Sequence, residues 1–231
     1  GQGSRTALQA MAADALEPDF DNVSLVMADT DRTLDCGSTA GSRSTFIGGN
    51  AMLNAIENFK KGEMETGKAD FPESEESFSI AGFPHAMYTF IAQAVKLRVD
   101  PVTGQVVLLD IAAATEAGRI INPLAMAGQI QGGVAMSVGY AFGENCQFKE
   151  GRLLNDSMST YLMPTAMDLP RIQSLHVDGY EPSGPMGVKG AAEVSTVSIA
   201  PAIAAAINEV SEGRLTSLPF DIETILNGLK K

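Results

Sequence analysis

Two β-rich segments joined by a short turn constrain the fold of this chain more than any other feature of its sequence. Residues 88–99 and 105–114 are rich in β-branched and other apolar residues, and residues 100–104 separate them. Within that connection, Pro101 and Gly104 occupy positions that suit a tight reversal. The pattern predicts an antiparallel hairpin near the middle of the chain.

Helices are predicted on both sides of this hairpin by apolar residues at helical spacing. Pro18 ends the first helical pattern, and Pro123 begins the longest one, in which glycines would let neighbouring backbones approach closely. The predicted helices cover residues 4–16, 46–59, 122–142, 201–210 and 221–229, and the glycines are Gly128, Gly132, Gly133 and Gly139.

The remaining segments predict short strands and loops. We expect a buried strand at residues 23–27, another strand at 173–178 and a second small hairpin at 146–154. Residues 29–44 predict a loop, and the polar run 60–79 predicts a mobile linker. Because strands and helices follow one another without a regular βαβ rhythm, the fold class expected is an α+β layered domain.

Chain length and hydrophobic content bound the domain organisation. A chain of 231 residues with 45% hydrophobic content can bury a sizeable core. We expect one domain over residues 1–231, with two subdomains. One subdomain comprises about residues 1–60 plus 190–231, and the other about residues 80–180.

Composition argues against several classes of partner and site. The net charge is −12, which repels phosphate backbones and anionic membrane surfaces, so we expect neither nucleic acid nor membrane as a partner. Cys36 and Cys146 are the two cysteines, too few to hold an iron–sulfur cluster or a structural zinc. His85 and His176 have no histidine companion at metal-binding spacing.

The first residues and the apolar runs predict a cytoplasmic location. Residues 1–16 lack the charged segment and uninterrupted apolar run of a signal peptide. Apolar runs such as residues 199–207 are too short to cross a bilayer. Because a helical pattern begins at once at Ser4, we also expect the chain to start partway through a larger fold.

Four glycine-containing segments precede or open helices and together predict an anionic ligand. Helix N-termini carry unpaired N–H donors and a positive dipole end, which makes such junctions suitable for anions. An ordinary turn explains any one of them equally well, and no P-loop or dinucleotide fingerprint is present. The segments are residues 1–3, 37–44, 118–129 and 184–193.

Glu193 is the candidate catalytic residue among these segments. It follows Ala191-Ala192, a small and apolar setting in which a carboxylate could be poorly hydrated, as a general base near neutral pH requires. It could equally be a glutamate that favours the following helix electrostatically. A serine hydrolase is disfavoured, since the chain has no GxSxG sequence.

A set of motifs runs from one end of the chain to the other. They are Gly1-Gln2-Gly3 with Thr6 and Gln9, Asp29-Thr30-Asp31 with Gly41-Ser42-Arg43 and Gly49-Asn50-Ala51, residues 99–104, 118–123 and 128–129, Asn155 with Tyr161, Pro164, Asp168 and Pro170, Gly190-Ala191-Ala192-Glu193, and residues 200–203. In these motifs the chain resembles the molybdopterin-binding subunits of the molybdenum hydroxylases, the family of xanthine dehydrogenase and aldehyde oxidase. The resemblance implies the C-terminal half of such a subunit.

This resemblance implies roles for the matching residues. Glu193 would be the base that takes a proton from a molybdenum-bound hydroxyl, which attacks an electron-poor carbon while hydride passes to a molybdenum-bound chalcogenide, usually sulfido. Molybdenum itself would be held through the pterin and by no side chain of this chain. The expected cofactor-binding residues are Gly1, Gln2, Gly41, Ser42, Arg43, Gln129 and Lys189.

The resemblance also implies a larger enzyme, which hydroxylates a purine-like or nicotinate-like N-heterocycle or oxidises an aldehyde. The cofactor would be molybdenum–molybdopterin, with the cytosine dinucleotide form left open. Iron–sulfur clusters and FAD would lie on partner chains or domains, and the N-terminal half of the molybdenum subunit would complete the active site in a hetero-oligomer. A non-catalytic cofactor-binding or assembly module is the alternative, against which the retained Glu193 argues.

Two departures from the family pattern are visible. The connection from Asn50 to residue 88 is shorter than usual, and Glu116 stands where an aspartate is common. We expect neither departure to touch the site.

Overall fold

The computed structural model describes residues 2–63, 66–70 and 87–229, which fall into two compact units. The first unit comprises residues 1–90, 116–126 and 177–192, and the second comprises residues 91–115, 127–176 and 193–231. This division differs from the predicted subdomains, because residues 193–231 do not fall in one unit with residues 1–60. The predicted linker at residues 60–79 lies partly outside the described residues.

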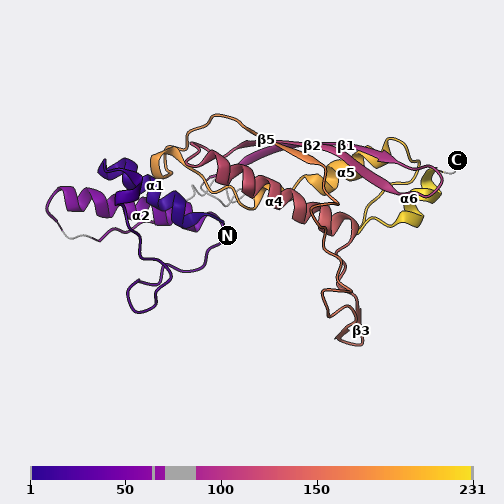
Figure 1. The fold of residues 1–231 in the computed structure, drawn as a ribbon, viewed down its shortest axis with the longest axis horizontal. Helices are drawn as coiled ribbons and strands as arrows, with labels where there is room; N and C mark the ends of the chain where they lie inside the picture. The colour runs from indigo at the N-terminus through magenta and orange to yellow at the C-terminus, as the bar shows by residue number, and fades with distance from the viewer. Residues whose placement is uncertain (1, 64–65, 71–86, 230–231) are drawn as a thin grey trace, which may run out of the picture. The chain divides into compact units, whose positions relative to one another are not determined.

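Two helices form the body of the first unit, and both confirm the sequence prediction. Helix α1 spans Ser4–Leu16 and helix α2 spans Arg43–Lys60, and they pack side by side (Figure 1). Helix α1 stops because Glu17 adopts a left-handed backbone directly before Pro18, which cannot continue a helix. Met11 and Phe46, one from each helix, are fully buried in the core.

Helix α2 also packs closely against a distant segment of the first unit. A Cβ added at Gly49 would lie 2.7 Å from the ring of Pro185, which begins the short 3-10 helix η2 at Pro185–Gly187. The amide of Asn50 donates a hydrogen bond of 2.9 Å to the carbonyl of Ser183. The start of η2 is therefore held directly on α2.

The predicted strand at residues 23–27 is wrong. The chain leaves the 3-10 helix η1, Phe20–Asn22, in an irregular path, and Val26 and Met27 are exposed. The amide nitrogen of Gln9 donates to the Val23 carbonyl at 2.8 Å and to the Phe20 carbonyl at 3.2 Å. Side chains of α1 thus satisfy carbonyls that a neighbouring strand would otherwise bind.

The sheet lies in the second unit, and its first two strands confirm the predicted hairpin. Strand β1 spans Phe90–Val99 and strand β2 spans Val106–Glu116, and they are neighbours in the sheet. The turn between them is closed by a hydrogen bond of 2.8 Å from the Asp100 amide to the Gln105 carbonyl. A connection this short requires the two strands to run antiparallel.

A third strand makes the sheet mixed. Strand β5, Arg171–His176, pairs in parallel with β2, in a register that sets Ile111 opposite Ile172. The strand was predicted from the sequence, but its parallel pairing was not. The sheet order is β1-β2-β5, and with the helices it gives the α+β class that was expected.

Three helices accompany the sheet, close to their predicted bounds. They are α4, Pro123–Phe142, α5, Ile199–Asn208, and α6, Ile222–Leu229 (Figure 1). Ile111 of β2, Ile130 of α4 and Ile203 of α5 are completely buried, so the core of the second unit draws on all three elements. Within the described residues, no helix has both the length and the apolar character needed to cross a membrane.

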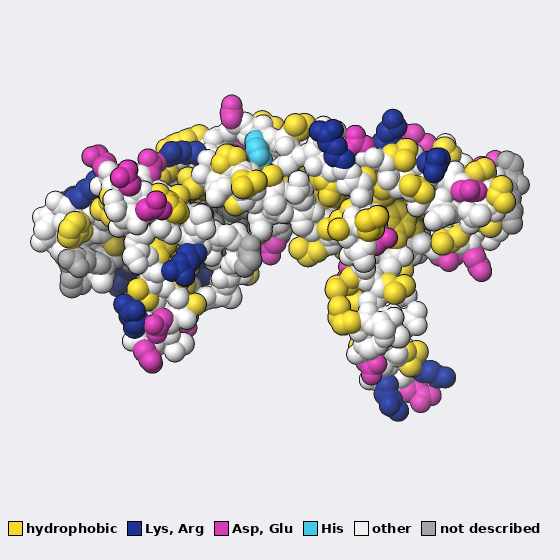
Figure 2. All heavy atoms as spheres, in the orientation of Figure 1, with side chains coloured by type: hydrophobic (Ala, Val, Ile, Leu, Met, Phe, Trp, Pro, Cys, Tyr) yellow, Lys and Arg dark blue, Asp and Glu magenta, His cyan; other side chains and the backbone are white. Residues whose placement is uncertain are grey.

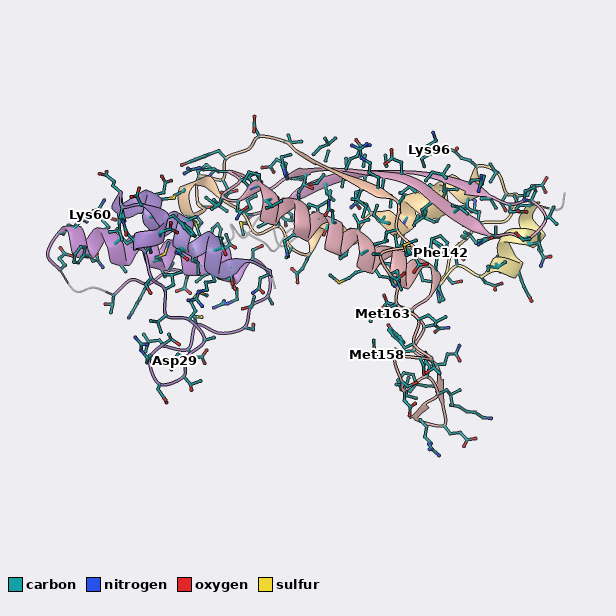
Figure 3. All side chains as sticks on the ribbon, in the orientation of Figure 1. Asp29, Lys60, Lys96, Phe142, Met158 and Met163 are labelled. Atoms are coloured by element: carbon teal, nitrogen blue, oxygen red, sulfur yellow. The ribbon has the colours of Figure 1, made fainter. Side chains whose placement is uncertain are left out.

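An arm, defined here as residues 145–168, leaves the end of α4. It carries the second predicted hairpin, in which β3, Phe148–Lys149, pairs antiparallel with β4, Arg152–Leu153 (Figure 1). Hydrophobic side chains gather along the arm in Figure 2, and Figure 3 labels two of its methionines. Its exposed large apolar side chains are Phe148, Leu153, Leu154, Met158, Leu162, Met163 and Met167.

Candidate functional site

The predicted site residues are divided between the two units. Gln129 and Glu193 belong to the second unit, and the others belong to the first. Gly1 lies outside the described residues, and Gln2 is exposed directly before α1. The contacts of the site residues in each unit are therefore described separately.

Two helix N-termini in the first unit have the donors that an anion requires. Gly3 precedes α1 with a φ of 79°, and Ser42 precedes α2 with a φ of 67°, so both helices begin from a left-handed residue. Among the described residues, neither N-terminus has a side-chain cap or an acidic residue in its first turn. Their first backbone N–H groups are therefore not bonded by a capping side chain or faced by a carboxylate of their own first turn.

The corner at Gly41 and Arg43 adds space and a positive charge to the start of α2. Gly41 is exposed with a φ of 56°, and a Cβ added there would meet no described atom within 4 Å. Arg43 donates a hydrogen bond of 3.4 Å to the carbonyl of Cys36, so its guanidinium stays beside the loop that precedes the helix. The corner combines an open approach, a helix dipole and a cation.

Gly190 brings a second predicted segment to this corner. A Cβ added at Gly190 would lie 2.2 Å from the hydroxyl oxygen of Ser42 and 2.9 Å from its Cα, so only glycine allows the approach. The hydroxyl of Thr89 donates a hydrogen bond of 2.8 Å to the Gly190 carbonyl and holds the segment from its other side. The structure thus places two of the four predicted segments in direct contact within the first unit.

Lys189 takes part in a partly buried ion pair. Its ammonium lies 2.6 Å from the carboxylate of Glu116 and donates a second hydrogen bond of 2.8 Å to the Tyr88 carbonyl. The side chain is 8% exposed, and the ammonium stands 5.4 Å from the centre of the Phe90 ring. The expectation that Glu116 does not touch a candidate site residue is wrong, because its carboxylate binds Lys189 directly.

The pKa of Glu116 reflects this pairing. Burial alone would raise the pKa, but the hydrogen bonds from the Lys189 ammonium and the Gly118 amide, together with the lysine charge, outweigh it. The pKa is therefore lowered from its ordinary value, and the carboxylate is ionised at neutral pH. Lys189 is neutralised by its partner, so its role as a cofactor ligand stays a prediction.

Glu193 lies in the second unit and caps a short turn. It precedes the 3-10 helix η3, Val194–Thr196, and its carbonyl accepts hydrogen bonds from the amide of Thr196 at 3.1 Å and from the Thr196 hydroxyl at 2.8 Å. Its side chain is exposed, so the expectation that neighbouring alanines leave the carboxylate poorly hydrated is wrong for this chain by itself.

Helix α4 approaches this turn closely. The buried hydroxyl of Ser195 donates a hydrogen bond of 3.4 Å to the carbonyl of Gln129. A Cβ added at Gly133, one turn further along α4, would lie 1.8 Å from the Ser195 hydroxyl oxygen. The predicted close approach at the α4 glycines is thus confirmed at Gly133. It is also confirmed at Gly139, where an added Cβ would lie 2.0 Å from a carboxylate oxygen of Glu144. Gly128 and Gly132 face open space among the described atoms.

Three residues that the sequence analysis missed hold the same turn. Gln93 of β1 donates a hydrogen bond of 3.0 Å to the Ser195 carbonyl. Tyr140 of α4 donates to the Thr196 carbonyl, and the hydroxyl of Ser137 lies 3.2 Å from the same oxygen. One signal could have found Gln93: it is a polar residue on the less exposed side of an alternating strand.

Metal coordination by protein side chains has no support in the described part of the chain. No group of three or more His, Cys, Asp or Glu residues is assembled there. His176 ends β5 and is exposed, as are Cys36 and Cys146, while His85 lies outside the described residues. The donors present are backbone N–H groups and a guanidinium, which suit an anionic organic ligand.

Comparison with known proteins identifies the family. The family model of the molybdopterin cofactor-binding domain matches residues 1–79 and 63–170. The whole chain is 26% identical to part of a probable xanthine dehydrogenase subunit of Bacillus subtilis, covering 36% of that protein. It is 29% identical to part of the gamma subunit of the 6-hydroxypseudooxynicotine dehydrogenase complex of Paenarthrobacter nicotinovorans, covering 35% of it.

The fold has a close match among solved structures. The aldehyde oxidoreductase of Desulfovibrio desulfuricans superposes with a TM-score of 0.83 and 26% identity, over 99% of this chain and 28% of the other. This chain therefore spans about a third of the length of the relatives it matches. With the matched family model, these similarities establish that the chain belongs to the molybdopterin cofactor-binding domain family.

Proposed function

We propose that this chain is part of a molybdenum hydroxylase, an oxidoreductase of the xanthine dehydrogenase and aldehyde oxidase type that hydroxylates an N-heterocycle or oxidises an aldehyde. The observation that carries the proposal is the pair of uncapped helix N-termini in the first unit, which fits an anionic pterin cofactor. When bound, molybdenum–molybdopterin supplies the two-electron redox chemistry of the metal. The chain's own residues bind this cofactor and handle the proton.

The cofactor-binding role falls to the predicted residues. Gln2 lies directly before α1, and Ser42 at the start of α2 offers its backbone N–H to an anionic oxygen. The Arg43 amide is bonded to the Ala40 carbonyl, so Arg43 contributes its guanidinium as a charge-assisted donor. Gly41 leaves the approach open because it has no side chain. Gln129 contributes a side-chain amide from α4, which can both donate and accept hydrogen bonds.

Glu193 is proposed as the base. Its carboxylate accepts the proton that must leave the attacking oxygen, and this step needs a carboxylate that is ionised beforehand and held in a fixed direction. The side chain is exposed in this chain, so bound cofactor and the rest of the enzyme must exclude water around it.

The rest of the enzyme is proposed to lie on other domains or chains. The two relatives described above are about three times as long, and both are named as subunits. The proposed neighbours in a hetero-oligomer are the N-terminal half of the molybdenum subunit and the iron–sulfur and FAD subunits. The exposed apolar side chains of the arm are consistent with a surface that contacts such a neighbour. We also propose a cytoplasmic location. Both cysteines are free and exposed, which suits the reducing conditions of the cytoplasm.

The test is Glu193→Gln in the assembled enzyme. We expect the molybdenum and pterin content to stay at the wild-type level while turnover falls by about 100-fold or more, because a neutral amide cannot accept the proton. Glu209→Gln is the matched control, since it makes the same change at an exposed glutamate beyond α5 and should leave turnover intact.

Two results would contradict the proposal. Undiminished turnover of Glu193→Gln would remove the assignment of the base. A wild-type complex that binds the cofactor but turns over neither N-heterocycles nor aldehydes would favour the alternative, a non-catalytic cofactor-binding or assembly module.

A further inference from the structure

Two backbone carbonyls of the turn that follows Glu193 accept hydrogen bonds from side chains of the second unit. The Ser195 carbonyl accepts a hydrogen bond from the amide nitrogen of Gln93, and the Thr196 carbonyl accepts one from the hydroxyl of Tyr140. Gln93 lies in β1 and Tyr140 in α4, and both residues belong to the second unit. The turn is therefore anchored on the body of the unit, although it carries an exposed glutamate.

Gln93 spans the turn with both ends of its amide. Its nitrogen donates to the Ser195 carbonyl at 3.0 Å, and its oxygen accepts a hydrogen bond of 2.6 Å from the hydroxyl of Ser198, directly before α5. Because a carbonyl can only accept, the bond to Ser195 fixes which end of the amide is the nitrogen. One side chain thus ties the η3 turn to the start of α5.

The close packing of α4 leaves the turn little freedom on its other side. Ser195 is completely buried, and an added Cβ at Gly133 would overlap its hydroxyl. Tyr140 lies two turns further along the same helix and bonds the next residue of the turn, Thr196. Displacement of the turn would break hydrogen bonds to β1 and α4 at the same time.

We infer that Gln93 and Tyr140 are positioning residues, which fix the backbone of the turn and through it the direction of the Glu193 carboxylate. This inference rests on the proposed role of Glu193 as the base. Both residues act through the backbone of the turn and not on the reacting atoms. Positioning is needed because a displacement of about 1 Å at a reacting group can cost about 100-fold in rate.

The experiment is a double-mutant cycle in the assembled enzyme with Gln93→Met, which keeps the length of the side chain and removes both hydrogen bonds. We expect kcat to fall by about tenfold, with KM within about twofold and molybdenum content unchanged. In a Glu193→Gln background, Gln93→Met should have almost no further effect, because the group that it positions is already disabled.

A second readout does not depend on activity. In the cofactor-free protein, hydrogen exchange at residues 193–198 should be faster in Gln93→Met than in the wild type, since the amide of Thr196 bonds the Glu193 carbonyl inside the turn. Gln105→Met is the matched control, because Gln105 is exposed in the turn between β1 and β2. It should change neither exchange nor kcat.

The outcomes separate the inference from the proposed function. An equal loss from Gln93→Met in both backgrounds, or unchanged exchange at residues 193–198, would overturn the inference. If Gln93→Met prevents assembly, Tyr140→Phe gives the same test, because it removes one hydroxyl and keeps the ring. Full activity of Glu193→Gln would instead overturn the proposed function.

Discussion

The ammonium of Lys189 and the carboxylate of Glu116 lie 2.6 Å apart and join the end of β2 to the segment that leads to Gly190. The backbone supports the same connection, because the Gly118 amide donates to Glu116 and the Lys189 amide donates to the Ala117 carbonyl. The ion pair therefore holds the segment that leads to Gly190, which contacts Ser42 at the start of α2.

Glu116→Gln should destabilise the first unit in a pH-dependent way. The folded pKa of Glu116 is lowered, so the ion pair contributes stability that is complete above the unfolded pKa of about 4.5 and is lost as the pH falls through the folded value. We expect a loss of about 2 kcal/mol at neutral pH, and a smaller difference from the wild type below pH 4. Thermal or urea unfolding at several pH values measures it.

The chain provides its own control for burial. Glu57 and Lys61 in and after α2 are also 2.6 Å apart, but their side chains are 62% and 54% exposed. Solvent screens such a pair, so Glu57→Gln should leave stability unchanged within error. Equal effects of the two substitutions would mean that burial does not set the strength of the Lys189–Glu116 pair.

Gly190→Ala should disturb the contact with Ser42. The added methyl group would overlap both the side chain and the Cα of Ser42, and backbone must move to relieve this. We expect a loss of about 1–3 kcal/mol in unfolding free energy and weaker cofactor retention, measured as molybdenum per protein after dialysis. Gly132→Ala in α4 is the control, which should be neutral or stabilise by up to about 1 kcal/mol. Its added Cβ meets no described atom within 4 Å.

Ser42→Asp should move stability and cofactor binding in opposite directions. A carboxylate at the N-terminus of α2 interacts favourably with the helix dipole, by about 0.5 kcal/mol, but it repels an anionic ligand from the same N–H groups. We expect a small rise in melting temperature and a loss of bound pterin. Asn227→Asp adds the same charge at an exposed position in α6 and should not affect pterin content. Retained pterin in Ser42→Asp would exclude the α2 N-terminus as a binding group.

Tyr161 should titrate late. Its hydroxyl donates a hydrogen bond of 2.8 Å to the carboxylate of Glu144 at the base of the arm, and this bond is the main cause that raises the tyrosine pKa to about 12. Because the folded pKa is raised, the stability from this bond is complete below pH 10 and is lost as the pH rises through about 12. In a pH titration followed by the ultraviolet absorbance of tyrosinate, the rise near pH 12 should be absent in Tyr161→Phe. In Tyr180→Phe, that step should remain.

Local signals predicted most of the elements because they act within a few residues. Helix α1 matches its predicted bounds, since its apolar spacing and Pro18 lie within the segment itself. The strand expected at residues 23–27 failed for the opposite reason. Its apolar residues were suitable, but Gln9 and Arg5, more than ten residues earlier, bind the carbonyls of that segment. No property of the segment itself reveals this.

The candidate site shows the same limit. The helix starts and the glycine segments could be identified from the sequence. The contact between Ser42 and Gly190 requires a residue without a side chain at position 190, and the sequence shows that glycine. Glu116 was dismissed because its partner, Lys189, is 73 residues away. The hydration of Glu193 was misjudged, because two flanking alanines say little about what covers a side chain in three dimensions.

Gln93 is 102 positions away from the residue whose carbonyl it binds. Since the bond is made to the main chain, the identities of Ser195 and Thr196 matter less to it than their backbone path. A single change in β1 can therefore remove this hydrogen bond without altering any residue near Glu193 in the sequence. A motif search centred on Glu193 would pass over the position on which its geometry depends.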